Sequence, residues 1–83
     1  MNRKEIFDKL RLLIVDQLDV SADEVHEDSE FLSDLGADSL DIVDMVMKIE
    51  DEFGLDIDDE DAQEMQTVRR VIDYLQQSLQ SSK

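Results

Sequence analysis

The 83-residue sequence contains no cysteine and no proline, and it has only two glycines. Without cysteine the chain has no disulfide, no thiolate metal site and no thiol of its own. The scarcity of glycine and proline favours helices over a turn-rich β fold. No apolar run is long enough to span a bilayer, and no basic-then-apolar signal segment is present. We therefore expect one small soluble domain over residues 1–83, without a membrane span, in the cytoplasm.

Basic residues are also scarce, since eight lysines and arginines stand against 23 acids and leave a net charge of −15. Residues 38–64 hold twelve of these acids and one basic residue, Lys48, which can pair at helical spacing with Asp41 or Asp44. Residues 1–18 are close to neutral. Such a field repels nucleic acid and anionic membranes and favours encounters with basic protein surfaces. Acidity alone fits a solvated surface, but its concentration in one segment favours a docking function.

Apolar periodicity predicts an all-α fold, a small bundle of three long helices and one short helix. The expected helices run from Arg3 to Leu18, from Asp38 or Ser39 to Phe53, from Asp59 to Met65, and onward from the cap Thr67. Asn2 with Glu5 resembles a capping box, and Asp38 is a good N-cap. Gly54 suits the left-handed residue that ends a helix. Residues 80–83 are expected to form a frayed tail.

The connection over residues 19–37 is polar and longer than most connections in compact domains. A single helical turn is expected at Ser21–Glu24 within it. Its apolar side chains are expected to pin the loop to the core. These are Val25, Phe31, Leu32 and Leu35.

The second helix has two apolar stripes. Ile42, Val46, Ile49 and Phe53 form the expected core stripe at about 100° per residue. Leu40, Val43 and Met47 lie roughly 125° around the helix, beside Asp44 and Asp51. Either Val43 belongs to the edge of the core with its neighbours half-buried, or this stripe faces a partner. We favour the partner, because acids can orient it while the apolar groups supply affinity.

Ser39 begins the second helix, where a serine is most often only a cap. Asp38 already fills the cap position, so we expect the Ser39 hydroxyl to be exposed. A phosphate ester there would meet free backbone N–H groups and the positive end of the helix dipole. The preceding Leu35, Gly36 and Ala37 are small or apolar and leave room for a modifying enzyme. These features permit a modification at Ser39 without predicting one.

The run Asp34-Leu35-Gly36-Ala37-Asp38-Ser39-Leu40-Asp41 resembles the phosphopantetheine attachment motif of bacterial acyl carrier proteins. The likeness continues through residues 46–53, 59–62 and 67–74 and covers nearly the whole chain. The length and the motif are similar to a free-standing carrier of fatty-acid synthesis. The resemblance implies that the chain is not an enzyme. It implies instead a 4′-phosphopantetheine arm, esterified to Ser39 from coenzyme A, that carries growing acyl chains as thioesters.

The resemblance also implies partners and their contact sites. The partners are a phosphopantetheinyl transferase (the holo-carrier synthase), malonyl transacylase, ketosynthases, reductases, dehydratases and acyltransferases, which have basic docking surfaces and meet a monomeric carrier. The positions that match partner contacts are Asp38, Leu40, Asp41, Val43, Asp44, Met47, Glu50 and Asp51. The positions that match the core, which in this family opens to hold the acyl chain, are Phe31, Val46, Ile49, Phe53, Ile57, Met65, Val71 and Leu75.

Three residues depart from the family's pattern. Asp58 replaces a common proline before the third helix, so the start of that helix is expected to be looser. Ile42 replaces a polar residue and extends the core stripe. Ser33 replaces an acid that in some relatives helps bind divalent cations near Asp38 and Asp41. We therefore expect any cation site there to be weak and no specific metal site.

Two alternatives remain open at this stage. One is a dedicated carrier for a polyketide or another acyl product, and the other is an acidic helical adaptor without a covalent arm. An enzyme is disfavoured because the sequence offers no metal site or phosphate-cradling loop, and the lone His26 has no nucleophile nearby in sequence. A calcium-binding EF-hand from Asp56 is excluded, because its sixth and twelfth positions hold Asp61 and Thr67 instead of glycine and glutamate.

Overall fold

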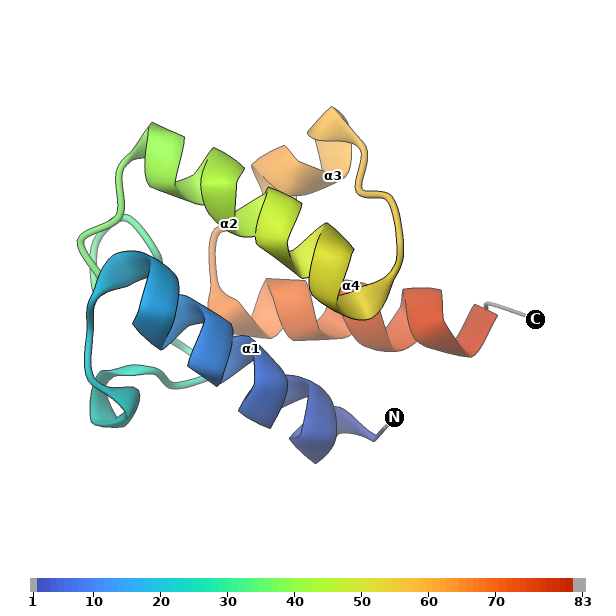
Figure 1. The fold of residues 1–83 in the computed structure, drawn as a ribbon, viewed down its shortest axis with the longest axis horizontal. Coiled ribbons are helices and arrows are strands. Elements are labelled where there is room, and N and C mark those ends of the chain that lie inside the picture. The colour runs from blue at the N-terminus through green and yellow to red at the C-terminus, as the bar shows by residue number, and fades with distance from the viewer. Residues whose placement is uncertain (1, 82–83) are drawn as a thin grey trace.

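A computed structural model describes residues 2–81 as a small helical bundle (Figure 1). Its elements are α1 (Arg3–Leu18), the 3₁₀ turn η1 (Ala22–Glu24), α2 (Ser39–Phe53), α3 (Asp59–Glu64) and α4 (Val68–Ser81). Helix α1 packs against both α2 and α4, and it begins on the side of the bundle where α4 ends. The predicted all-α fold is confirmed. No helix within residues 2–81 is long and apolar enough to cross a bilayer. The tail that was expected to be frayed is helical at residues 80–81, because α4 continues to Ser81, and residues 82–83 lie outside the described residues.

Local caps explain where the long helices begin and end. The Asn2 side chain accepts the Glu5 N–H at 2.9 Å, and the Glu5 carboxylate accepts the Asn2 N–H at 3.0 Å. Gly54 follows α2 with a φ of 67°, the left-handed conformation that closes a helix at the lowest cost for glycine. The Thr67 hydroxyl accepts the Arg70 N–H at 3.2 Å and caps α4. Each of these caps was predicted, because each is encoded within four residues.

The core is built from the apolar faces of α1, α2 and α4 and from side chains of the connections. Its buried members are Ile6, Leu10, Ile14, Val25, Phe31, Leu35, Ala37, Met45, Val46, Ile49, Ile57, Met65, Val68, Val71, Ile72 and Leu75. The predicted core stripe of α2 faces the core, with Val46 and Ile49 buried and with Ile42 and Phe53 half-buried against it, but the prediction left out the fully buried Met45. Met45 lies about 40° from Ile49 around the helix, so the two share the core-facing side.

The long loop between α1 and α2 folds back onto the start of α4. The Phe31 N–H donates to the Gln66 carbonyl at 3.1 Å, and the Val68 N–H donates to the Ser29 carbonyl at 3.0 Å. This pairing turns Phe31 fully into the core. The next side chain, Leu32, points outward and is 58% exposed, so the prediction that it pins the loop was wrong. The other three predicted anchors of the loop are buried.

Arg3 forms the most connected group of ion pairs among the described residues. Its guanidinium lies 2.8 Å from Glu27 in the loop and 2.7 Å from Asp73 in α4. The hydrogen bond from Arg3 is the main reason that the pKa of Glu27 lies below its usual range. The same bond raises the pKa of Arg3. Glu27 therefore stabilises the fold mainly as a carboxylate.

Replacing Glu27 with glutamine should lower the free energy of unfolding near neutral pH, and the loss should shrink in acid. Because the folded pKa lies below the ordinary value of 4.5, the stabilisation is fully present above that value. It is lost as the pH falls through the folded pKa. Urea unfolding of both proteins from neutral pH to about pH 3 measures the difference. A difference that grew toward acid would contradict this assignment.

Candidate attachment site and docking face

Ser39 is exposed at the first position of α2, and its hydroxyl is not needed to cap that helix. The Asp38 carboxylate accepts the Asp41 N–H at 2.9 Å, and the Asp41 carboxylate accepts the Asp38 N–H at 3.2 Å. This reciprocal box leaves the N–H groups of Ser39 and Leu40 without a partner inside the helix. Those groups and the positive end of the helix dipole can face an anionic ester on the Ser39 oxygen.

The turn before Ser39 depends on Gly36. Its φ of 69° is in the left-handed region, where a residue with a side chain is strained by about 1 kcal/mol or more. No atom lies within 4 Å of the place where a Cβ would stand, so conformation rather than space requires the glycine. Ala37 then donates its N–H to the Phe31 carbonyl at 2.8 Å. Ser39, three residues after Gly36, is exposed.

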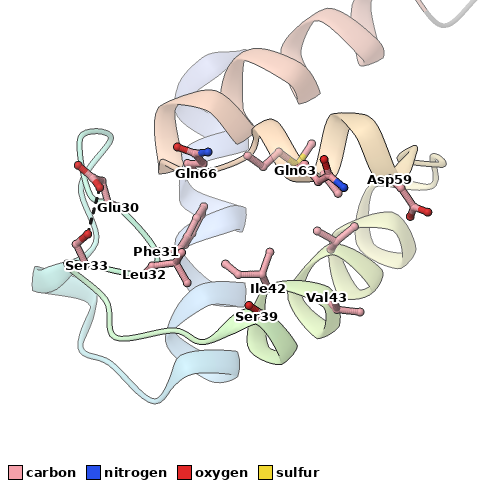
Figure 2. A pocket seen from close by; sticks show the side chains of 13 residues that line it. Glu30, Phe31, Leu32, Ser33, Ser39, Ile42, Val43, Asp59, Gln63 and Gln66 are labelled. Atoms are coloured by element: carbon pink, nitrogen blue, oxygen red, sulfur yellow. Dashed lines mark hydrogen bonds between the residues drawn. The ribbon is translucent and has the colours of Figure 1, made fainter.

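A pocket of about 450 Å³ opens beside Ser39 (Figure 2). It is lined by Glu30, Phe31, Leu32, Ser33, Ser39, Ile42, Val43, Val46, Asp59, Ala62, Gln63, Met65 and Gln66. The loop supplies one wall, α2 the second, and α3 with the residues after it the third. Phe31, Val46 and Met65 are buried and give the pocket an apolar floor, whereas Ser39 is exposed at its rim.

The pocket takes in only part of the core positions that the resemblance assigns to the acyl chain. Three predicted residues, Phe31, Val46 and Met65, line it. The other five, Ile49, Phe53, Ile57, Val71 and Leu75, do not, and Ile49, Val71 and Leu75 are fully enclosed in the core. They would line the pocket only if it deepened into the core, as the family resemblance implies. Sequence reasoning missed Ala62 and Leu32, and it placed Ile42 in the core rather than at the pocket.

The second apolar stripe of α2 is exposed, which excludes the interpretation that it forms the edge of the core. Leu40 is 75% exposed, Val43 55% and Met47 58%. Asp44 and Asp51 are exposed as well, whereas Glu50 is half-buried. We call the exposed stripe of Leu40, Val43, Asp44, Met47 and Asp51 the docking stripe.

Glu50 differs from Asp44 and Asp51, the two acids of the docking stripe. Its carboxylate accepts the Ile57 N–H at 2.7 Å across the connection between α2 and α3. Ile57 is buried, so this bond fixes the chain where it leaves the core toward α3. The structure therefore gives Glu50 a structural contact that sequence reasoning did not anticipate.

The acids of residues 38–64 are almost all free of ion pairs within the part of the chain that the structure describes. Glu52 is the exception, with Lys9 at 3.2 Å. Lys48 pairs with neither Asp41 nor Asp44 among the described residues, so that prediction was wrong. An exposed pair gains little in water, and the Asp41 carboxylate already accepts a backbone N–H. The surface around the docking stripe consequently keeps its negative charge.

Comparisons with known proteins agree with this geometry. A family model described as a phosphopantetheine attachment site matches residues 8–75. The structure of the acyl carrier protein from Enterococcus faecalis, which is described for its high thermal stability, superimposes with a TM-score of 0.75. The two chains are 39% identical, and the match covers 90% of this chain and 95% of the other. The chain belongs to the bacterial-type acyl carrier protein family.

An acyl carrier protein is a carrier and not a catalyst. The cofactor of this family is a covalently attached phosphopantetheine. Its partners are the transferase that attaches the cofactor and the synthesis enzymes that use it. The residues of this carrier fit such a group, because an exposed hydroxyl, free backbone N–H groups and an apolar pocket meet at Ser39.

Proposed function

We propose that Ser39 bears the phosphopantetheine arm and that the carrier presents growing acyl chains to the enzymes of fatty-acid synthesis. The observation that supports this most directly is the exposed, uncommitted Ser39 hydroxyl at the rim of an apolar pocket of about 450 Å³. When bound, the arm supplies the thiol that this cysteine-free chain lacks. The likeness to a free-standing bacterial carrier supports a cytoplasmic, monomeric protein.

The residues around Ser39 have separate tasks in this proposal. Asp38 and Asp41 hold the start of α2 in place, and the free N–H groups there offset the repulsion between a phosphate and nearby carboxylates. The apolar floor of the pocket accepts the first part of an acyl chain. Met65 is suited to that floor, because its unbranched side chain adapts to guests of different length.

The docking stripe serves partner recognition in this proposal. Its carboxylates attract basic enzyme surfaces, and Leu40, Val43 and Met47 supply the apolar contact. Val43 also lines the pocket, so an enzyme that covers the stripe would also contact the rim of the acyl site. We expect malonyl transacylase, ketosynthases, reductases, dehydratases and acyltransferases to bind here, and also the transferase that modifies Ser39.

The pathway can be tested by reconstitution. The protein is first converted with coenzyme A and a broad-specificity phosphopantetheinyl transferase. It is then mixed with malonyl transacylase, ketosynthase, reductases and dehydratase of fatty-acid synthesis, malonyl-coenzyme A and reduced nicotinamide cofactor. Intact mass should show saturated chains growing on the carrier. If the converted protein is not elongated while a known fatty-acid carrier is, the fatty-acid assignment fails and a dedicated carrier for another acyl product is favoured.

Changes in the docking stripe should weaken partner binding without unfolding the carrier. Met47→Ala removes an exposed apolar contact, and Asp44→Lys reverses a steering charge, so each should raise the Kd for a partner enzyme about tenfold. Surface plasmon resonance measures the Kd, and circular dichroism checks the helicity. Leu12→Ala is the matched control, because Leu12 is an equally exposed apolar residue but lies on α1. Loss of helicity in Met47→Ala would instead place this residue in the core.

A further inference from the structure

The guanidinium of Arg3 joins three elements that lie far apart in the sequence. Its Nη2 donates to Glu27 Oε1 in the loop at 2.8 Å. Its Nη1 donates to Asp73 Oδ1 at 2.7 Å and to Gln76 Oε1 at 3.3 Å, both on α4. Arg3 is itself the first residue of α1. A single side chain therefore connects the start of α1, the loop and the middle of α4.

The loop side of this connection is held by a second arginine. Arg69 Nε lies 3.7 Å from Glu27 Oε1, and Arg69 Nη2 lies 2.6 Å from Asp28 Oδ1. The backbone N–H of Arg69 also donates to the Glu27 carbonyl at 2.8 Å. Glu27 thus lies between two cations, Arg3 of α1 and Arg69 of α4. None of these groups belongs to the docking stripe or to the attachment site.

The loop segment held in this way continues directly into the wall of the pocket. Residues 27–31 make three backbone hydrogen bonds with residues 66–69, through the N–H groups of Arg69, Val68 and Phe31. Residues 30–33 then line the pocket beside Ser39 (Figure 2). Any opening of residues 27–31 would therefore move that wall.

We propose that Arg3 is a latch that holds residues 27–31 against α4 and so keeps the loop wall of the pocket in place. Helices α1 and α4 are also held together by fully buried apolar side chains, which the loss of Arg3 leaves intact. Phe31 is held by its buried side chain, but Glu27 and Asp28 meet α1 and α4 through the polar contacts described above, so this part of the loop depends more on the latch. Half-exposed ion pairs are individually weak, so the loss of the latch should lower the free energy of unfolding only slightly and should appear mainly as more frequent local opening of the loop. Any effect of the latch on a bound acyl chain rests on the proposed function, whereas the contacts that form the latch do not.

Hydrogen exchange followed by NMR on the unmodified full chain tests the latch. In Arg3→Gln, the amides of Phe31, Val68 and Arg69 should exchange roughly fivefold faster, because both ion pairs of Arg3 are lost. The amides of Ile14 and Ile49 in the helical core should exchange faster only by the factor that corresponds to the small loss in the free energy of unfolding of the same variant. Lys4→Gln is the matched control, since it removes only an exposed pair with Asp8 at the same end of α1 and should change neither group.

Two further variants separate a latch from a general contribution to stability. Arg3→Lys keeps the charge but lacks the planar guanidinium that reaches two carboxylates at once. Its loop amides should therefore exchange at a rate between those of the wild type and Arg3→Gln. Glu27→Gln should accelerate the same amides, and adding it to Arg3→Gln should have little further effect. Loop amides that exchange only through global unfolding, with the same urea dependence as the core amides, would overturn the latch, and so would an unchanged exchange rate in the loop. The exchange experiment uses the protein without the phosphopantetheine arm, so either result leaves the proposed carrier function unaffected. Failed elongation in the reconstitution would likewise leave the latch unaffected.

Discussion

Replacing Ser39 with alanine is expected to abolish the attachment of phosphopantetheine. Alanine has no oxygen to form the phosphate ester, and no other hydroxyl begins a helix beside the pocket in the described residues. The fold should survive, because the cap of α2 is built by Asp38 and Asp41. Intact mass after incubation with coenzyme A and a broad-specificity phosphopantetheinyl transferase should show the unmodified chain.

Ser33→Ala is the matched control for this experiment. Ser33 lines the same pocket, but its hydroxyl donates to Glu30 at 3.2 Å and it lies in the loop rather than at a helix start. This variant should gain one phosphopantetheine, as the wild type does. Labelling of Ser39→Ala to the wild-type level would overturn the assignment of Ser39, and so would loss of labelling in Ser33→Ala alone.

Phe31→Ala should destabilise the carrier severely. Phe31 is fully buried, lines the floor of the pocket and anchors the loop through its backbone bonds to Gln66 and Ala37. Truncation of a buried phenylalanine costs about 3–5 kcal/mol. A small domain has only about 5–15 kcal/mol in total, and the net charge of −15 lowers what this one has through self-repulsion. Urea unfolding followed by circular dichroism should show a much lower midpoint or no folded baseline.

Leu32→Ala provides the comparison within the same loop. Leu32 is the neighbouring residue but is 58% exposed, so its truncation should change the free energy of unfolding by no more than about 0.5 kcal/mol. A wild-type midpoint for Phe31→Ala would show that its packing does not hold the loop. Equal losses in the two variants would contradict the assignment of one side chain to the core and the other to solvent.

The helices could be predicted because their signals are local. The cap formed by Asn2 and Glu5, the box of Asp38 and Asp41 and the glycine at position 54 each involve residues within one turn of the helix end. The exposed stripe of α2 was also within reach of the sequence, since a helix in a small bundle can turn only one face inward. These predictions needed no knowledge of how the helices pack.

The lining of the pocket and the ion pairs depended on that packing. The loop, α2 and α3 meet at the pocket, and no periodicity within one element tells how deep the cavity reaches. The resemblance implied that Ile49 and Val71 line a core that opens, and both lie in the enclosed core below the pocket. Alternation within a short loop segment does not say which of Phe31 and Leu32 turns inward. The bond of Arg3 with Asp73 joins residues 70 positions apart. Only the folded backbone brings such groups together.

The distribution of ion pairs has a consequence for how long a partner stays bound. Arg3, Lys9 and Arg69 are paired within the fold, whereas Asp44 and Asp51 in the docking stripe keep exposed, unpaired charges among the described residues. Exposed charges raise the association rate of a complex more than they slow its dissociation. The three apolar side chains of the stripe form only a small contact, which also allows rapid dissociation. Each complex should therefore form quickly and dissociate quickly. Rapid dissociation suits a protein that must leave one enzyme before the next can act on its cargo.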